Sequence, residues 1–299
     1  CVVFSSAMAQ YAQPLLPQVP MLVDFVDVDS AKWTQYAPAH RWPLSLLYRL
    51  EGRRLLAYER AMATLARRSY FVTPNETALF LSQAPECQGR VQSMGNGVDA
   101  DFFVPNPLRL NPFEAGEQAV VFTGAMDYWP NIDGVSWFAA DVLPLLRTRW
   151  PLARFYIVGR SPSSQVQALA GAHVVVTGTV PDVRPYLQYA SAVVAPLRVA
   201  RGIQNKILEA MAMQQPVVTG SSCADAIGAT VGQGLLRADT PEEFVEALKP
   251  LLESPYNAAA LGQQARRYVE QECSWQAHLS GIDSCLGSLR AKPHQEVVA

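Results

Sequence analysis

Polar side chains that could take part in chemistry lie at the start of a predicted apolar helix in the stretch RGIQNKILEAMAMQQPVV, residues 201–218. Asn205, Lys206 and Glu209 begin the predicted helix, directly after Gly202. A helix N-terminus carries unpaired N–H groups and about half a positive charge, which suits a diphosphate. Gly202 has no Cβ atom, so a ligand can approach its backbone closely. This segment therefore indicates a site for an anion.

The spacing of Lys206 and Glu209 adds a second function to this site. Residues three apart are neighbours on one face of a helix. A lysine there neutralises phosphate charge, and a carboxylate accepts hydrogen bonds from the two vicinal hydroxyls of a ribose. The alternative is a structural ion pair between these two side chains, with Asn205 as the helix cap. The residues alone leave both interpretations open.

A glycine turn after a predicted strand is the second candidate element. The stretch FTGAMDYWPN, residues 122–131, has the pattern strand, turn, helix. We expect Gly124, Ala125 and Met126 in this turn to face the diphosphate. No arginine or lysine lies between Gly124 and Asn131, so positive charge must come from elsewhere. Three arginines that follow other predicted elements could supply it, or could be ordinary surface residues: Arg160, Arg198 and Arg201.

The second half of the chain has the pattern of a parallel sheet. Short apolar runs alternate with helical patterns, as in a sheet that is covered by helices on both faces. Such a doubly wound α/β domain binds ligands at the carboxyl ends of its strands. The predicted strands are 119–124, 154–159, 173–178, 191–197 and 215–220, and the predicted helices between and after them are 131–147, 163–170, 182–189, 205–213, 256–272 and 275–290.

The first half is also α/β but incomplete. It starts at Cys1 within a predicted strand, so we expect a chain that is truncated at its N-terminus. The run MLVDFVDVDS, residues 21–30, predicts a strand that ends in polar residues, and we place Asp29, Ser30 and Lys32 on the acceptor side of a cleft. Ser30 as a helix cap is the equally weighted alternative. We expect domains at 1–112, including a Pro-rich and Asn-rich linker, and at 113–299.

The segment 40–69 has a different character, because its seven arginines far outnumber its two glutamates. A basic amphipathic helix over 43–66 could lie on an anionic membrane surface. Alternatively, its apolar side packs on the N-terminal sheet and its arginines are solvated.

Composition excludes several classes. The 299 residues are 49% hydrophobic and 17% charged, as in a globular protein, and the net charge of −2 gives no electrostatic footprint for nucleic acid. Five scattered cysteines indicate neither a zinc site nor a disulfide scaffold and fit a reducing cytosol. No apolar run approaches the roughly 20 residues of a membrane span, and we recognise no signal peptide.

Two motifs together indicate a resemblance to a known protein family. The first is a turn after the N-terminal domain, here Asn96, Gly97, Val98, Asp99 and then Phe102 or Phe103. The second is a pair of glutamates eight residues apart, of which the latter lies in LEAMA and is Glu209 here. With these motifs the chain resembles the GT-B glycosyltransferases of family 4, glycosyl transferases group 1, over nearly its whole length. It departs from the family at the first glutamate, where Arg201 stands. The segments DVDSAKW, FTGAMDYWPNIDGV and RGIQNKILEAMAM look like the exopolysaccharide transferases of the exosortase/PEP-CTERM system.

The resemblance implies two Rossmann-like doubly wound domains facing across a cleft and a bacterial enzyme that transfers a hexosyl unit with retention, without a cofactor or a metal. The implied donor is a UDP- or GDP-linked sugar, and the implied acceptor is a glycan or a polyprenyl-linked glycan. We expect a cytoplasmic protein, with peripheral contact at the inner face of the plasma membrane as an option. The residues expected to act in catalysis are Arg201, Lys206 and Glu209. Those expected to bind the donor are Gly124, Ala125, Met126, Arg160, Arg198, Gly202, Ile203, Gln204 and Asn205.

Two other functions stay open from the sequence. A GT-B sugar-nucleotide epimerase would convert the donor without an acceptor. A non-catalytic module that binds nucleotide sugars is favoured by Arg201 at the glutamate position.

Overall fold

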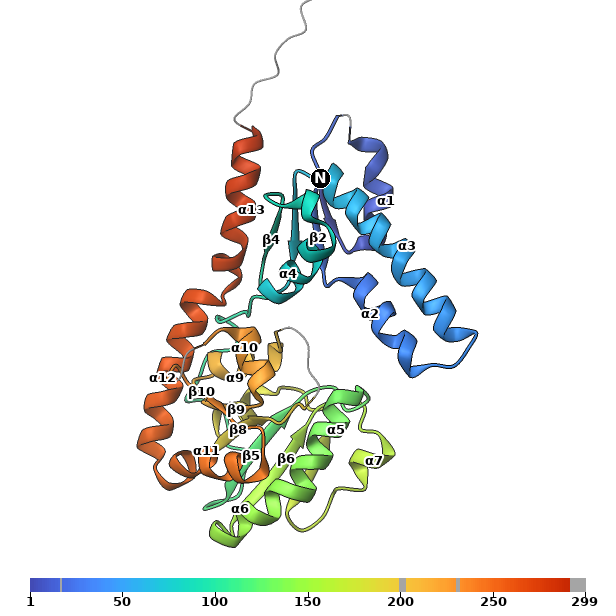
Figure 1. Cartoon of the computed structure of the whole chain (residues 1–299). Coiled ribbons are helices and arrows are strands. Elements are labelled where there is room, and N and C mark those ends of the chain that lie inside the picture. Colours follow the sequence, from blue (N-terminus) through green and yellow to red (C-terminus); the bar gives the residue numbers. More distant parts are fainter. Residues whose placement is uncertain (17, 199–202, 230–231, 291–299) are drawn as a thin grey trace, which may run out of the picture. The chain divides into compact units, whose positions relative to one another are not determined.

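The computed structural model describes residues 1–290 apart from 17, 199–202 and 230–231 (Figure 1). The chain forms two compact units, Cys1–Gly95 and Asn96–Ala299. Each unit contains one parallel sheet with helical connections, as the apolar strand pattern predicted.

The boundary between the units differs from the expected one at residue 112. The segment 96–112 packs on the second unit through its backbone. Val98 donates its N–H to the carbonyl of Cys273 (2.9 Å), and the Arg266 guanidinium donates to the carbonyls of Phe103 (2.9 Å) and Ala100 (3.2 Å). The segment therefore belongs to the second unit rather than forming a free linker.

The first unit has a four-stranded sheet in the order β1-β2-β3-β4 with all neighbours parallel. Its core includes the rings of Phe25, Phe71 and Phe80, with the centroids of Phe25 and Phe71 5.2 Å apart and those of Phe71 and Phe80 4.8 Å apart. The strands are β1 (Val2–Phe4), β2 (Leu22–Val26), β3 (Arg68–Phe71) and β4 (Val91–Ser93). The helices are α1 (Ala9–Ala12), α2 (Asp29–Tyr36), α3 (Leu44–Leu65) and α4 (Pro74–Gln83), and short 3₁₀ turns lie at Ser6–Met8, Gln13–Leu15, Ala37–Ala39 and Pro85–Cys87.

The second unit has a six-stranded sheet in the order β10-β9-β8-β5-β6-β7, again parallel throughout. Helices cover both faces of this sheet (Figure 1). The strands are β5 (Gln118–Thr123), β6 (Ala153–Val158), β7 (Val174–Gly178), β8 (Ala192–Ala195), β9 (Val217–Thr219) and β10 (Leu235–Arg237). The helices are α5 (Trp129–Trp137), α6 (Leu143–Arg149), α7 (Ser164–Gln167), α8 (Arg184–Gln188), α9 (Asn205–Ala212), α10 (Ser221–Ile227), α11 (Pro241–Glu253), α12 (Pro255–Glu272) and α13 (Trp275–Arg290), with a π-helical turn at Phe138–Val142.

The strand order of the second unit creates a topological switch point between β5 and β8. The chain runs from β5 outward through β6 to β7, then returns to the other side of β5 as β8. The connections after β5 and β8 therefore diverge to opposite faces, and the carboxyl ends of these two strands flank a crevice, the usual place of ligands in such sheets. Gly124 follows β5, and α9 is the helix after β8.

Candidate functional site

Lys206 lies in the first turn of α9, at the carboxyl edge of the second sheet. Its Nζ donates to Oδ1 of Asn131 (2.5 Å) and lies 4.7 Å from the centroid of the Phe122 ring. Asn131 is almost fully buried at the start of α5, and its Nδ2 donates to the carbonyl of Ala125 (2.8 Å). Asn131 thus connects the loop after β5 to α9.

Asn131 is a site residue that the sequence analysis did not identify. The only signal is its place at the start of a helix that follows a strand and a glycine turn, where an Asn side chain often bonds to nearby backbone. Phe122 was expected as a strand residue only. Neither assignment predicts contact with a lysine 75 positions away from Asn131.

The electrostatics of Lys206 favour an anion beside it. Burial lowers the pKa of its ammonium group to about 8, although Cys223 and Glu209 nearby act in the opposite direction. Among the residues that the structure describes, no carboxylate forms an ion pair with Lys206. A desolvated cation without a counter-ion is poorly stabilised, so this position gains most from an anionic ligand.

The loops after β5 and β6 approach each other at two glycines. A Cβ atom on Gly159 would lie 1.7 Å from the carbonyl oxygen of Gly124, and a Cβ atom on Gly124 would lie 2.9 Å from Nδ2 of Asn131 and 3.3 Å from Nζ of Lys206. A side chain at residue 159 would clash with the backbone of Gly124, and a side chain at residue 124 would displace the ends of the Asn131 and Lys206 side chains. The backbone of Gly124 is therefore directly beside the ammonium group of Lys206.

The start of α9 has no side-chain cap. Gln204 occupies the N-cap position, but its side chain does not bond to the first-turn N–H groups. Asn205 is the first helical residue and is exposed, and its Oδ1 accepts from Nδ2 of Asn96 (3.3 Å). The alternative in which Asn205 caps this helix is wrong. Ile203 and Gln204 are half-buried in the approach to the helix.

The turn that carries Asn96 is held against α13. A Cβ atom on Gly97 would lie 2.5 Å from the Trp275 ring, and Val98 forms a parallel bridge with Ser274. The side chain of Asp99 accepts the N–H of Phe102 (2.8 Å) and so closes the turn. These contacts place Asn96 beside the first residue of α9.

Glu209 lies one turn further along α9 and is half-buried. Burial raises the pKa of its carboxyl group, and the nearby Lys206 partly offsets this. In the described part of the chain the carboxylate has no hydrogen-bond or ion-pair partner, and Lys206 bonds to Asn131 instead. The structural ion pair that the alternative interpretation required is not formed.

The candidate arginines are placed differently. Arg160 is exposed after β6, and its guanidinium makes no hydrogen bond or ion pair within the described residues. Arg198 follows β8 but donates to both carboxylate oxygens of Asp133 (3.0 and 2.5 Å), so its charge is already paired. Arg201 and Gly202 lie outside the residues that the structure describes.

Two expected site residues are core residues instead. Met126 is fully buried, and its N–H donates to the carbonyl of Arg160 (2.8 Å), so neither its side chain nor its amide faces a ligand. Ser30 is buried inside the first unit, where its Oγ donates to Glu59 (2.6 Å). Ser30 is also not a helix cap, because it is the second residue of α2. In both cases packing against neighbouring segments buries the side chain.

The polar cluster in the first unit is held by ion pairs. Nζ of Lys32 lies 2.9 Å from Asp27 and 3.0 Å from Asp29, and both carboxylates are partly exposed. Behind them, burial raises the pKa of Glu59 to about 7, despite the hydrogen bonds from the Ser30 hydroxyl and amide that act against it. Asp29 and Lys32 thus remain at the surface of the unit, and Ser30 between them in sequence is buried and bonds to Glu59.

The long helix α3 combines exposed arginines with exposed apolar side chains. Trp42, just before the helix, is 78% exposed, and Leu46 and Leu47 in its first turn are each 54% exposed. The middle of the helix packs on α2, because a Cβ atom on Gly52 would lie 2.5 Å from Oγ1 of Thr34. The arginines of this segment that are exposed are Arg41, Arg49, Arg53, Arg54, Arg60 and Arg67.

Within the described residues, no helix is both long and apolar enough to cross a membrane. The same part of the chain contains no group of three or more His, Cys, Asp or Glu side chains arranged to hold a metal ion.

Comparison with known protein families gives one match. Residues 117–254, slightly less than half of the chain, match the family model described as Glycosyl transferases group 1. The comparison with curated proteins finds no match.

Solved structures resemble nearly the whole chain. Sucrose-phosphate synthase from Thermosynechococcus elongatus has a TM-score of 0.70 at 19% identity, over 97% of this chain and 73% of that one. HepE from Anabaena, in complex with UDP, has a TM-score of 0.71 at 15% identity, over 96% and 78%. WaaG, a glycosyltransferase involved in lipopolysaccharide biosynthesis, has a TM-score of 0.63 at 18% identity, over 94% and 81%. At these identities the likeness shows the fold, and the predicted GT-B class is confirmed.

Proposed function

We propose that this protein is a glycosyltransferase that moves a sugar from a nucleoside-diphosphate sugar to a glycan or a lipid-linked acceptor. The observation that carries the proposal is the half-buried Lys206, whose ammonium group has no counter-ion among the described residues and lies at the switch point beside Gly124. The segment that matches the glycosyl transferases group 1 model contains all of these residues, and the similar protein HepE is described in complex with UDP and with UDP-glucose.

The donor would lie along the carboxyl edge of the second sheet. Its diphosphate fits between the glycine loops and the uncapped start of α9, where backbone N–H groups point outward. Lys206 would neutralise one phosphate, and Arg160 on the same edge has a guanidinium without a partner among the described residues. The carboxylate of Glu209, which has no partner in the described part of the chain, would accept hydrogen bonds from the ribose hydroxyls. Ile203, Gln204 and Asn205 would contact the donor through their backbone.

Transfer breaks the bond between the anomeric carbon and the diphosphate oxygen, and the electron pair of this bond stays on the diphosphate. The acceptor hydroxyl forms the new bond to the anomeric carbon and loses its proton. Lys206 and the N–H groups of α9 would stabilise the charge that develops on the leaving group, and a preorganised cation is well suited to this. We propose retention of configuration at a hexosyl unit and a reaction without a metal or a cofactor. Arg201 and Gly202, expected at the same place, lie outside the described residues.

The acceptor would bind on the first unit, where Asp29 and Lys32 keep partly exposed charges. We further propose that α3 and the residues before it contact an anionic membrane at the inner face of the plasma membrane, because Trp42, Leu46 and Leu47 are exposed beside arginines. A role in exopolysaccharide synthesis of the PEP-CTERM type is consistent with such an acceptor.

The donor site is tested by titrating UDP, GDP and their glucose conjugates into the full chain and following heat and thermal stability. A bound donor should raise the unfolding temperature by mass action. Glu209→Ala should weaken or abolish donor binding without changing the fold, whereas Glu246→Ala on α11 is a matched control. Unchanged donor binding in Glu209→Ala would contradict the site assignment.

Transfer itself is tested by incubating the protein with each sugar nucleotide, with and without lipid-linked glycan acceptors, and separating the products. Release of nucleoside diphosphate that depends on acceptor supports the proposal. Conversion of the sugar nucleotide alone would show an epimerase, and binding without any product would show a non-catalytic module.

Membrane contact is tested by co-sedimentation with vesicles of phosphatidylglycerol and with vesicles of phosphatidylcholine. Leu46→Ser should lower the fraction bound to the anionic vesicles. Leu152→Ser, at a 64% exposed leucine of the second unit, should not. Equal sedimentation of both variants would argue against α3 as the contact.

A further inference from the structure

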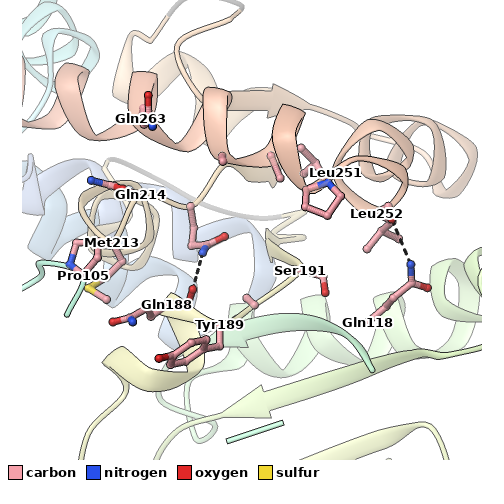
Figure 2. A pocket seen from close by; sticks show the side chains of 15 residues that line it. Pro105, Gln118, Gln188, Tyr189, Ser191, Met213, Gln214, Leu251, Leu252 and Gln263 are labelled. Atoms are coloured by element: carbon pink, nitrogen blue, oxygen red, sulfur yellow. Dashed lines mark hydrogen bonds between the residues drawn. The ribbon is translucent and has the colours of Figure 1, made fainter. Parts of the chain in front are cut away.

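A cavity of about 490 Å³ lies in the second unit at the edge of the sheet opposite to Lys206 (Figure 2). It opens at the amino ends of the strands: Gln118 begins β5, Ser191 precedes β8, and Gln215 precedes β9. β5 alone spans six residues, which separates the two edges by roughly 17 Å at about 3.3 Å per residue. The cavity is therefore distinct from the proposed donor site.

The lining of this cavity has an unusual composition. Five glutamines contribute to it, and none of its fifteen lining residues carries a charge. The glutamines are Gln118, Gln188, Gln214, Gln215 and Gln263, and the apolar part includes Pro105, Ala190, Met213, Leu251, Leu252 and Pro255 and the alanines 258 and 259. Figure 2 shows amides on both sides of the cavity, with Leu251 and Leu252 along the wall.

Several of these polar groups have hydrogen-bonding capacity to spare. Gln118 uses its Nε2 on the carbonyl of Leu252 (3.2 Å), and Gln215 uses its Nε2 on the carbonyl of Gln188 (3.0 Å), which holds both side chains in place. The Oε1 atoms of these two side chains accept no hydrogen bond from the described residues. The side-chain amides of Gln214 and Gln263 and the hydroxyl of Ser191 likewise have no hydrogen-bond partner among the described residues.

The two fully available amides are brought together by a close backbone contact. A Cβ atom on Gly262 would lie 1.9 Å from the carbonyl oxygen of Gln214, so the turn after α9 approaches α12 closely only because residue 262 is glycine. Gln214 itself has a left-handed backbone with φ of 60°, which is uncommon for a residue other than glycine. The next residue along α12 is Gln263, on the rim of the same cavity.

We propose that this cavity binds an uncharged oligosaccharide. Each amide group both donates and accepts hydrogen bonds, as sugar hydroxyls do, and the leucine, methionine and proline side chains suit the apolar C–H faces of pyranose rings. A charged ligand would be desolvated there without a compensating charge, which disfavours nucleotides and uronic acids. The volume lies within the range of about 300–1,000 Å³ that is usual for ligand pockets. In a transferase this site would anchor a glycan away from its reacting end, and that consequence rests on the proposed function.

Binding is tested on the full chain by saturation-transfer NMR and calorimetry with three neutral probes, maltotriose, cellotriose and mannotriose, and with trigalacturonate as the charged counterpart. We expect at least one neutral probe to bind and trigalacturonate not to bind. Gln263→Leu should weaken binding about fivefold, the effect of one lost hydrogen bond. Gln264→Leu, at the adjacent exposed position outside the cavity, is the matched control and should leave binding unchanged.

A second variant blocks the cavity rather than its polar groups. Ala259→Trp on α12 places a large ring in the opening and should abolish binding of the neutral probe. UDP titration of the same variant reports on the fold and on the donor site separately. The proposal is overturned if no neutral probe binds to the wild type, or if the probe binds equally well to Ala259→Trp. A wild-type protein that binds the neutral probe but not UDP would instead count against the proposed donor site.

Discussion

Replacing Lys206 by methionine tests the physical basis of the proposed donor site, because it removes the charge and keeps the length of the side chain. In the free protein burial lowers the pKa of Lys206 from 10.5 to about 8. At 1.36 kcal/mol per pKa unit, the charged form is disfavoured by about 3 kcal/mol relative to water. A diphosphate beside the ammonium group would restore this stabilisation. Part of the binding free energy would therefore come from relieving an unfavourable buried charge.

The same shift predicts how donor binding depends on pH. Below pH 8 Lys206 is already protonated in the free protein, so its titration leaves the affinity for UDP unchanged. Above pH 8 the group must take up a proton on binding, and the affinity should fall by up to about tenfold per pH unit until the pKa in the complex is reached. The decline therefore starts near the folded-state pKa of the free protein.

The assay is calorimetric titration of UDP from about pH 7 to about pH 10, in buffers of different ionisation enthalpy that report proton uptake. Lys206→Met should bind UDP roughly thirtyfold more weakly at pH 7, since a hydrogen bond to a charged group contributes about 2 kcal/mol. The variant should also lose the decline above pH 8. Lys249→Met on α11, far along the sequence from the site, should behave as the wild type. Wild-type affinity and an unchanged pH profile in Lys206→Met would refute the reasoning.

Three other predictions follow from single contacts. Glu209→Gln should weaken binding of UDP about tenfold, because the carboxylate would bond to both ribose hydroxyls of UDP. Binding of 2′-deoxy-UDP, which lacks one of these hydroxyls, should weaken much less. An equal loss of affinity for both ligands, measured by calorimetry, would contradict the ribose assignment. Gly159→Ala should lower the free energy of unfolding by about 1–3 kcal/mol in urea titrations, since its Cβ would lie 1.7 Å from the carbonyl oxygen of Gly124. Gly171→Ala, where a Cβ meets nothing within 4 Å, is the control. Equal urea midpoints for the two variants would show that the loops separate freely. Glu59 has a pKa raised from 4.5 to about 7, so between these values the folded state keeps a proton that the unfolded state loses. The free energy of unfolding should therefore fall by about 3 kcal/mol as pH rises from about 4.5 to about 7, and then level off. Glu59→Gln should lack this decline in urea titrations across that range, and the same pH dependence in the variant would contradict the raised pKa of Glu59.

The alternation of strands and helices in the second unit was largely predictable from the sequence. Each apolar run is bounded by a helical pattern or a glycine turn, and these are local signals. The run expected at 154–159, for example, is β6 at Ala153–Val158. β10 at Leu235–Arg237 was missed because three residues are too few to show a period. The domain boundary was placed too late because the segment 96–112 looks like a linker by composition alone.

The sequence by itself determined the fold class, the position of the glycine turn at Gly124 and the charged start of α9, because these depend on residue types over short stretches. Only the tertiary structure decided which side chains meet there. The pairing of Lys206 with Asn131, the burial of Met126 and the withdrawal of Ser30 toward Glu59 all come from contacts between distant segments. Desolvation, which lowers the pKa of Lys206, is likewise a property of the packed surroundings and not of neighbouring residues in the chain.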